Sequence, residues 1–271
     1  MIRADENEVA VPAWCQRIET LFLDLDGCVW FGDRLAEGAR EAVALLRERG
    51  KQVVFITNVS SATRHGIAGK LTELGIPASP DDVQVPLELL PRHEFLKDSE
   101  ARVFPLCAAR VRAAIEEFGI PVTDEPARAD VVVVGRDTEM TYDDLAAATQ
   151  ALYRGARLLA LNMDSRVPME DGVIVPGTGA IVAALREATG VQVELIGKPS
   201  RFFFDTALDT FGARRASTVM VGDTLDSDIV GGQVAGLKTV LVGGSRYTTL
   251  SEPPTPDLEL ARIASLPRYF R

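Results

Sequence analysis

Residues 21–27 read Leu-Phe-Leu-Asp-Leu-Asp-Gly, an apolar run that ends in two acids two residues apart. Side chains of a strand alternate between its two faces, so Asp24 and Asp26 project in the same direction. Open α/β sheets bind ligands outside the carboxyl ends of their strands. Two neighbouring carboxylates repel each other unless a cation or a proton compensates them. The segment therefore predicts a buried strand that ends at a chemically active site, although an ordinary acidic turn is the alternative.

Length and composition predict a globular chain with one large or two smaller domains. The chain has 271 residues, of which 46% are hydrophobic, and this length suffices for a packed core. No apolar run approaches the roughly 18 residues that a membrane span needs. Residues 1–20 are mixed and acidic and lack the pattern of a signal peptide. We expect no membrane association.

Charge and cysteine usage narrow the possible partners and the compartment. The net charge of −10 disfavours nucleic acid, because nucleic-acid binding depends on Lys and Arg that neutralise phosphates. A small anionic substrate remains compatible if local cations offset the overall field. Cys15, Cys28 and Cys107 are widely spaced and indicate neither a disulfide framework nor a zinc site. We expect a reducing, cytoplasmic location.

Strands and helices alternate along most of the chain, which predicts a doubly wound parallel sheet covered by helices on both faces. The early part predicts strands at 21–24 and 52–57 and helices at 37–49 and 63–74. The late part predicts strands at 193–196, 218–222 and 239–242 and helices at 202–211 and 226–235. The fold class is α/β, with a Rossmann-like core.

A second α/β segment interrupts this core. It predicts strands at 131–134, 158–161 and 173–175, and prolines with a charged tract precede it. We interpret residues 86–192 as an inserted domain and residues 1–85 with 193–271 as the core domain.

Four polar sites follow predicted strands. Besides Asp24-Leu25-Asp26-Gly27, they are Thr57-Asn58-Val59-Ser60, Gly197-Lys198-Pro199-Ser200 and Val221-Gly222-Asp223 through Asp228. Each alone could be a cap, a turn or a solvated surface group. Their shared position at strand carboxyl ends favours a common site.

The four sites are chemically coherent as a phosphoryl-transfer centre. Asp24 and Asp223, with one main-chain carbonyl, could hold Mg²⁺, a hard cation that prefers oxygen ligands. A carboxylate can attack phosphorus and form an aspartyl-phosphate. Lys198 adds positive charge, and Thr57 and Asn58 can donate hydrogen bonds to phosphate oxygens. A second acid must protonate the leaving oxygen and activate water, and Asp26 is the candidate.

These motifs, in this order, resemble those of the haloacid dehalogenase-like phosphatases. The long segment between the second and third motifs resembles the type-two cap of the NagD-like, p-nitrophenyl phosphatase-like subfamily (subfamily IIA), as does Pro176-Gly177-Thr178-Gly179-Ala180. The resemblance covers about residues 20–243. It implies a cap domain at 86–192 that closes over the site and selects the leaving group, and it leaves a homodimer possible.

The resemblance also implies a role for each residue. Asp24 would be the nucleophile and a Mg²⁺ ligand, and Asp26 would be the general acid/base and offer its main-chain carbonyl to the metal. Thr57 and Asn58 would bind the phosphate, and Lys198 would neutralise charge. Asp223 would ligate Mg²⁺. Asp228 would support the metal site, through water or through Lys198, and Asp226 is its neighbour in the motif.

Some positions depart from the family pattern or belong to the predicted cap. Cys28 and Val59 replace residues that are more usual in the family, and we interpret Cys28 as a small buried filler. The loop at 161–168 resembles the part of the cap that faces the leaving group. Its candidate substrate-binding residues are Asn162, Asp164 and Arg166.

The sequence thus predicts a Mg²⁺-dependent phosphatase acting on a small phosphorylated metabolite. A metal-independent dehalogenase of the same fold is one alternative, but a halide leaving group needs neither the second acid nor the metal. A non-catalytic ligand-binding or interaction protein that keeps only the scaffold is the other. The physiological substrate is not specified by these motifs.

Overall fold

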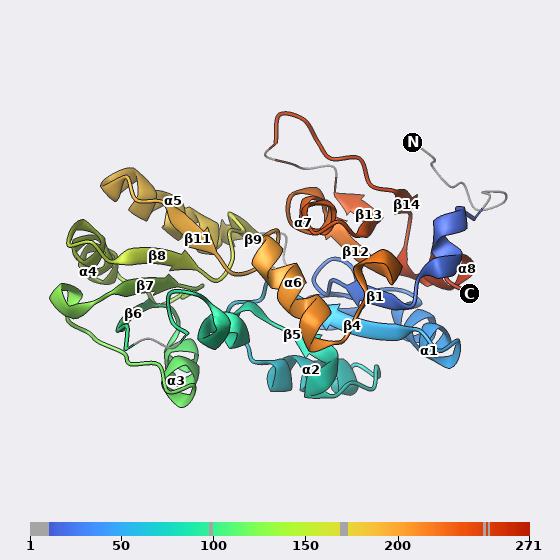
Figure 1. Ribbon diagram of the computed structural model, residues 1–271, viewed down its shortest axis with the longest axis horizontal. Helices are drawn as coiled ribbons and strands as arrows, with labels where there is room; N and C mark the ends of the chain where they lie inside the picture. The colour runs from blue at the N-terminus through green and yellow to red at the C-terminus, as the bar shows by residue number, and fades with distance from the viewer. Residues whose placement is uncertain (1–10, 98–99, 169–172, 246–247, 249) are drawn as a thin grey trace. The chain divides into compact units, whose positions relative to one another are not determined.

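The computed structural model describes residues 11–97, 100–168, 173–245, 248 and 250–271 (Figure 1). The chain forms two compact units. The first comprises Met1–Thr57, Arg64–Gln84 and Lys198–Arg271, and the second comprises Asn58–Thr63 and Val85–Gly197. The backbone therefore crosses between the units at four peptide bonds. The prediction about a signal peptide concerns in part residues 1–10, which lie outside the described residues.

The first unit is built on a six-stranded sheet in the order β14-β13-β12-β1-β4-β5, in which every pair is parallel. Its central strand, β1, is buried along its whole length, as expected for an apolar run covered on both faces. The chain leaves β1 towards β4 on one side and returns on the other through β12. The strands are β1 (Thr20–Leu23), β4 (Gln52–Ile56), β5 (Val83–Gln84), β12 (Thr218–Thr224), β13 (Lys238–Ser245) and β14 (Leu258–Leu260).

Helices and a small hairpin complete the first unit. The buried side chains of α1 recur at helical spacing and include Val43 and Leu46, so this helix packs one apolar stripe on the sheet. The α-helices are α1 (Ala39–Glu48), α2 (Arg64–Glu73), α6 (Arg201–Thr210), α7 (Val230–Val234) and α8 (Leu266–Tyr269). The hairpin is β2 (Trp30–Phe31) with β3 (Arg34–Leu35). A π-helical turn, η6 (Leu225–Ile229), precedes α7, and 3₁₀ turns are η1 (Ala13–Arg17), η2 (Pro80–Asp82), η5 (Arg215–Ser217) and η7 (Ile263–Ser265).

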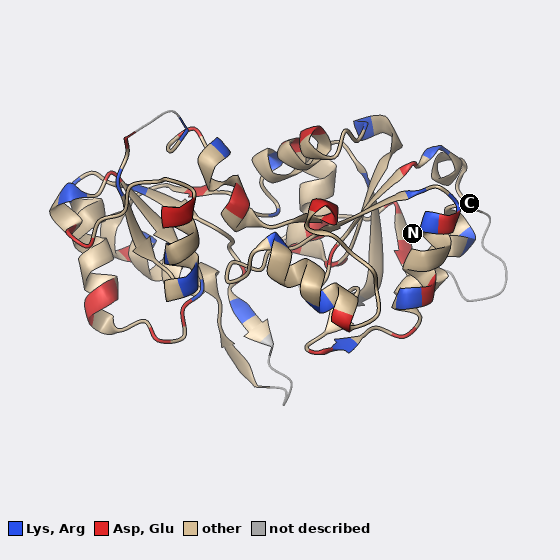
Figure 2. Ribbon diagram, turned by 90° about the horizontal axis from the view of Figure 1, so that it is seen from below, with Lys and Arg blue, Asp and Glu red and all other residues tan. Residues whose placement is uncertain are grey.

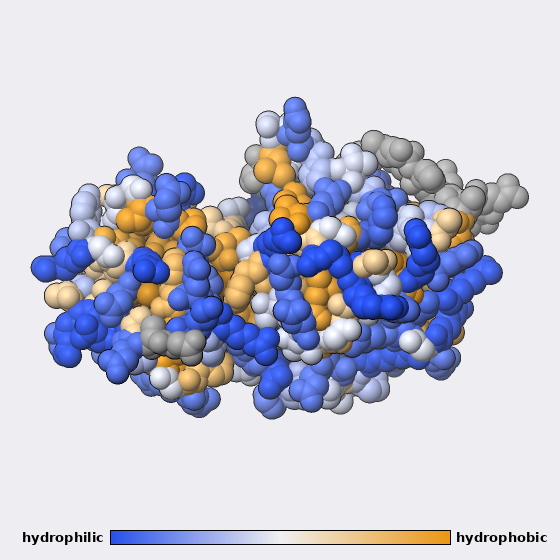
Figure 3. All heavy atoms as spheres, viewed as in Figure 1, coloured by the Kyte–Doolittle hydropathy of each residue, from blue (hydrophilic) through white to orange (hydrophobic). Residues whose placement is uncertain are grey.

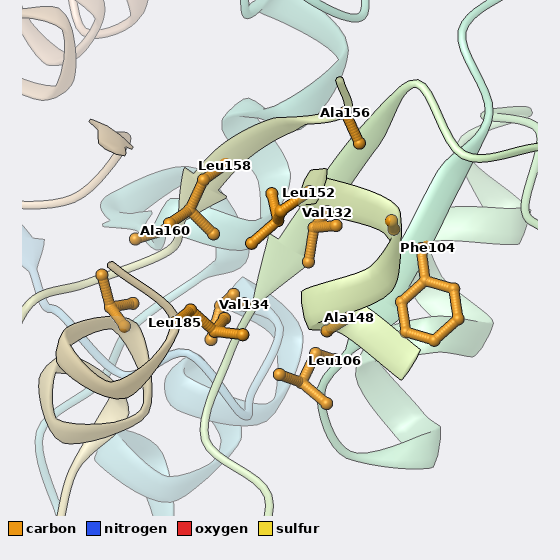
Figure 4. Packing of buried hydrophobic residues seen from close by; sticks show 12 residues of the cluster. Phe104, Leu106, Val132, Val134, Ala148, Leu152, Ala156, Leu158, Ala160 and Leu185 are labelled. Carbon is orange, nitrogen blue, oxygen red and sulfur yellow. The ribbon is translucent and has the colours of Figure 1, made fainter. Parts of the chain in front are cut away.

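The second unit has its own parallel sheet in the order β11-β8-β7-β6. One cluster of buried apolar residues joins this sheet to the helices Tyr142–Tyr153 and Thr178–Thr189. Figure 4 shows Val132 and Leu158 near Leu152 in it. The elements are β6 (Val103–Leu106), β7 (Val131–Val134), β8 (Arg157–Ala160), β11 (Val193–Leu195), α3 (Ala109–Glu117), α4 (Tyr142–Tyr153) and α5 (Thr178–Thr189). An antiparallel pair, β9 (Arg166–Pro168) with β10 (Ile174–Pro176), and two 3₁₀ turns, η3 (Pro86–Arg92) and η4 (Pro126–Arg128), complete it.

The unit boundaries differ from those expected from the sequence. We predicted residues 193–196 as a core strand, but β11 pairs with β8 in the second unit, which therefore extends to Gly197. Both units use parallel strands that alternate with helices, so the pattern of a three-residue edge strand does not say which sheet it joins. The catalytic and capping roles assigned to the two domains stay predictions.

Charged residues of both signs occur on the helices and loops of each unit (Figure 2). The face in Figure 3 likewise mixes hydrophilic and apolar residues. Within the part of the chain that the structure describes, no helix combines the length and apolar character that a membrane crossing requires.

Two neighbouring leucines of α1 provide a test of the packing. Leu46 is 0% exposed and Leu45 is 37% exposed. We expect Leu46→Ala to lower the free energy of unfolding by about 2–5 kcal/mol, because it leaves a cavity in the core. Leu45→Ala makes the same change of residue type on the same helix and should cost less than about 1 kcal/mol. Urea unfolding measures both, and equal losses would contradict the assigned packing of α1.

Candidate active site

The turn after β1 places the first two predicted acids. Asp24 is 6% exposed, and its amide donates to the Val221 carbonyl at 2.8 Å, which continues the pairing of β1 with β12. Asp26 lies on the exposed side of the turn. Gly27 has a φ of +88°, and a Cβ there would lie 2.3 Å from Asp223 Oδ2. Glycine is therefore required for both the backbone conformation and the close approach.

The end of β12 brings two further acids to the same place. A Cβ on Gly222 would lie 2.2 Å from Asp228 Oδ2, so glycine lets that carboxylate fold back against the strand. The Thr224 amide donates to Asp228 Oδ2 at 3.1 Å, and the Thr224 hydroxyl donates to Asp223 Oδ1 at 3.2 Å. Carboxylate oxygens of Asp24, Asp223 and Asp228 lie within 4.8 Å of one another.

Lys198 is the cation of this group. Its side chain is 2% exposed, and its Nζ donates to Asp24 Oδ1 at 2.5 Å and to Asp228 Oδ1 at 2.7 Å. It precedes α6, whose first turn is capped by the Ser200 hydroxyl, which accepts from the Phe203 amide. The strand before Lys198 belongs to the other unit, so its position follows from the start of α6 and not, as predicted, from a strand of the core sheet.

One ammonium does not neutralise three clustered carboxylates, and the pKa values reflect this. Burial raises the pKa of Asp24 well above its ordinary value, Lys198 opposes the rise, and Asp228 and Asp223 add to it. Burial and the charge of Asp228 raise the pKa of Asp223 to about 7. Burial by itself would lower the pKa of Lys198, but Asp228 and Asp24 outweigh it and raise that pKa.

The residues present fit a divalent cation. The three carboxylates offer hard oxygen ligands at the spacing of a metal site, and burial together with the neighbouring carboxylates raises the pKa values of Asp24 and Asp223. Cys28 is buried beside them, and burial together with the Asp24 charge raises the pKa of its thiol well above the usual value. The thiol stays protonated and apolar, in keeping with a filler.

The second polar motif is divided between the two units. Thr57 is 1% exposed at the end of β4, and its amide donates to the Gln84 carbonyl at 3.2 Å in the first unit. Asn58 follows it directly but belongs to the second unit. There the Asn58 Nδ2 donates to Asp164 Oδ1 at 3.2 Å. The sequence grouped Thr57 and Asn58 as one site and did not indicate this division.

The candidate cap residues form a network around Asn58. Asn162 is 5% exposed, its Nδ2 donates to the Asn58 carbonyl at 2.7 Å, and its Oδ1 accepts from the Asp164 amide at 3.2 Å. Arg166 lies exposed on β9. A Cβ on Gly177 would lie 2.1 Å from the Asp164 carbonyl oxygen. The structure thus brings Asn58, Asn162 and Asp164 together and explains the glycine beside them.

The sequence and the fold of this chain match known hydrolases. Models of haloacid dehalogenase-like hydrolases match residues 21–121 and 195–266. Human glycerol-3-phosphate phosphatase is 38% identical over 251 residues, which cover 83% of this chain and 78% of the human protein. The chain belongs to the haloacid dehalogenase-like hydrolases. A 5′-nucleotidase of Bacillus subtilis is 36% identical over 237 residues, covering 88% of this chain and 91% of that protein.

Solved structures of this hydrolase family share the fold. A glycerol phosphate phosphatase of Mycobacterium tuberculosis, solved in complex with magnesium, superposes with a TM-score of 0.83 at 30% identity, covering 95% of this chain and 78% of that one. p-Nitrophenyl phosphatases are among the other solved structures that match. The predicted family and fold class are confirmed. The phosphatase names of the relatives and the magnesium of the mycobacterial complex also agree with the predicted phosphoric monoester hydrolase and its Mg²⁺.

One residue of this hydrolase that contacts a predicted catalytic group was not among those expected from the sequence. The Trp30 Nε1 donates a hydrogen bond to Asp26 Oδ1 at 2.9 Å. Trp30 stands in the apolar run Cys28-Val29-Trp30-Phe31, which indicates only core packing. The sequence feature that could have indicated this hydrogen bond is the spacing of four residues between Asp26 and Trp30.

Lys198 is expected to hold the metal-free hydrolase together. Lys198→Met removes the cation between Asp24 and Asp228 and should lower the free energy of unfolding at pH 7.5 by about 3–5 kcal/mol, because it leaves buried charges unpaired. The loss of unfolding free energy in Lys198→Met should be smaller at pH 5, because protonation removes the carboxylate charges. Urea unfolding in the presence of a chelator measures both. Lys70→Met, at a partly exposed lysine, is the control, and equal losses in the two variants would contradict this role.

Proposed function

We propose that this hydrolase is a Mg²⁺-dependent phosphatase that cleaves small phosphomonoesters through an aspartyl-phosphate on Asp24. The observation that carries the proposal is the buried contact of Lys198 Nζ with Asp24 and Asp228, beside Asp223 at the carboxyl end of the central strand. This arrangement supplies a nucleophile, a fixed cation and metal ligands in one place. Two relatives support the proposal: a glycerol-3-phosphate phosphatase and a 5′-nucleotidase, each of which this chain matches over most of its length.

Asp24 is the nucleophile in the proposed reaction. Lys198 holds one of its oxygens and adds positive charge that lets the carboxylate approach a phosphate dianion. The carboxylate forms a bond to phosphorus, the ester P–O bond breaks, and its electron pair goes to the leaving oxygen. Asp26 donates the proton that this oxygen takes up. In the second half, Asp26 removes a proton from the water that attacks phosphorus. The bond between phosphorus and the Asp24 oxygen breaks, its electron pair returns to the carboxylate, and inorganic phosphate is released.

The metal ligands would be Asp24, Asp223 and the Asp26 carbonyl, with Asp228 supporting them through its contact with Lys198. When bound, Mg²⁺ neutralises phosphate charge and orients the group for in-line attack. Thr57 and Asn58 would donate hydrogen bonds to the phosphate oxygens. In the second unit, Asp164 and Arg166 would contact the leaving group, while Asn162, which is buried, would hold the loop of Asn58.

The substrate class is a small phosphorylated metabolite. The relatives are named for glycerol 3-phosphate and for nucleotides, so both belong in any screen. A homodimer and a cytoplasmic location stay predictions from the sequence.

Phosphate release from a panel of phosphomonoesters tests the proposed activity. The panel contains glycerol 3-phosphate, nucleoside monophosphates, sugar phosphates and p-nitrophenyl phosphate, each with Mg²⁺ and with a chelator. We expect release that requires Mg²⁺ and falls by at least about three orders of magnitude in Asp24→Asn, because the nucleophile is lost.

The matched control is Asp209→Asn, an exposed acid of α6, which should leave the rate unchanged. Folded wild-type protein that releases no phosphate from any ester with Mg²⁺ present would contradict the phosphatase and favour the binding-protein alternative. Full release in the presence of chelator would contradict the metal dependence.

Binding of Mg²⁺ should depend on pH in a defined direction. The pKa of Asp223 is about 7 without metal, against an ordinary value of 3.8. A carboxyl with a raised pKa stabilises the fold at low pH, and this contribution is lost as the pH rises through 7. Mg²⁺ needs the ionised form, so its affinity should fall about tenfold for each pH unit below that value.

Thermal unfolding measured against Mg²⁺ concentration at pH 5.5 and pH 8 gives the affinity at each pH. The metal should raise the unfolding midpoint at much lower concentration at pH 8. Asp223→Asn, which keeps the shape of the side chain, should weaken binding and flatten its pH dependence. An affinity that is equal at the two pH values would contradict the raised pKa of Asp223 in the metal-free protein, and unchanged binding in Asp223→Asn would contradict its role as a ligand.

A further inference from the structure

Asp26 is exposed on the turn after β1, yet a general acid must hold one orientation to deliver its proton. The Trp30 Nε1 donates to Asp26 Oδ1 at 2.9 Å. Among the described residues, this indole is the one side-chain hydrogen-bond partner of the Asp26 carboxylate. Trp30 itself is 1% exposed. An exposed acid is thus held by a buried ring.

The backbone fixes the position of Trp30. The Leu25 carbonyl accepts from the amides of Val29 and Trp30 at 2.9 and 3.0 Å. The Gly27 amide donates to the Trp30 carbonyl at 2.8 Å. Trp30 then begins the β2–β3 hairpin, where it pairs with Leu35. The loop that carries Asp26 and the ring that holds it are therefore parts of one hydrogen-bonded turn.

A lysine of α2 covers the indole from one side. The Lys70 Nζ lies 4.7 Å from the centre of the Trp30 ring, and it also donates to the Gly32 carbonyl and pairs with Asp33, both at 2.9 Å. A cation on the ring face is attracted to the π electrons. It also withdraws electron density from the ring, which makes the indole N–H a stronger donor.

We propose that Trp30 is a positioning residue that selects which oxygen of Asp26 carries the catalytic proton. The inference rests on the proposed phosphatase function. An indole N–H donates and cannot accept, so Asp26 Oδ1 remains an acceptor in both protonation states. The proton of the acid form therefore resides on Oδ2. It passes from Oδ2 to the leaving oxygen, while the indole keeps its own proton throughout.

Two esters that differ in leaving group separate this role from a structural one. Glycerol phosphate expels a strongly basic alkoxide that needs a proton, whereas p-nitrophenyl phosphate expels a stable phenolate that does not. The measured quantity is kcat/KM, which covers the steps up to departure of the leaving group. A loss of folded enzyme or of the site as a whole lowers kcat/KM for both esters equally.

We expect Trp30→Phe to lower kcat/KM for glycerol phosphate about tenfold and for p-nitrophenyl phosphate less than about threefold. Asp26→Asn should show the same selectivity with a loss of about 10²–10⁴-fold on glycerol phosphate, the usual contribution of a general acid. The double variant should equal Asp26→Asn, because the ring acts only through that carboxylate. Trp14→Phe, at the other tryptophan, is the matched control and should change neither ester.

Equal losses on the two esters in Trp30→Phe would overturn the proposal, and so would a loss that adds to that of Asp26→Asn. A measurement independent of activity covers the case in which Trp30→Phe fails to fold. The chain has two tryptophans, so its ¹⁵N spectrum has two indole N–H signals, which Trp14→Phe assigns. Asp26→Ala should move the Trp30 signal and leave that of Trp14 in place.

An unmoved Trp30 signal in protein that hydrolyses phosphomonoesters would overturn the inference alone. Wild-type protein that hydrolyses no ester would overturn the proposed function, and the positioning role with it, whatever the signal does. The two failures are therefore distinguishable.

Discussion

Charge compensation at the end of β1 is the constraint on which this structure depends. Asp24, Asp223 and Asp228 converge, and among the described residues Lys198 is the cation paired with Asp24 and Asp228. Such a cluster would be costly in a site built only for stability. The surrounding features make room for it: Gly27 and Gly222 permit approaches that a Cβ would block, and the parallel order of β12, β1 and β4 aims three strand ends at one place. A fold that concentrates negative charge in this way is prepared for a cation and an anionic substrate.

The central residues of the site could be predicted from the sequence, because each belongs to a short segment whose pattern can be recognised by itself. An apolar run followed by two acids specifies a buried strand and what lies at its end, and β1, β4 and β7 form within one residue of the expected limits. The assignment of Asp24 and Asp223 to one site needed only that parallel strands end on the same edge of a sheet, whereas Lys198 joins them from the residues before α6. The structure brings these three together, whereas the catalytic role of each stays a prediction.

What the sequence did not indicate depends on partners far along the chain. Strand β6 contains Pro105, and a proline in a run of residues argues against a strand because it lacks an amide hydrogen. The structure accommodates Pro105 because β6 lies at the edge of its sheet. The placement of β11 depends on which of two similar sheets it joins. The hydrogen bonds from Asn162 to Asn58 and from Trp30 to Asp26 concern side-chain geometry, which the pattern of residue types does not encode.

The places where the backbone passes from one unit to the other limit how a unit of this protein can be exchanged for that of a relative. Two of the four crossings fall at Thr57–Asn58 and Gly197–Lys198, where a residue proposed for the chemistry stands at the junction itself. Exchange of the second unit for that of a relative would therefore carry Asn58 with it and place the joint one peptide bond from Lys198. The two units cannot be treated as interchangeable modules, because residues proposed for the chemistry stand at these junctions. If the second unit selects the leaving group as proposed, substitution within it disturbs these junctions less than its replacement does.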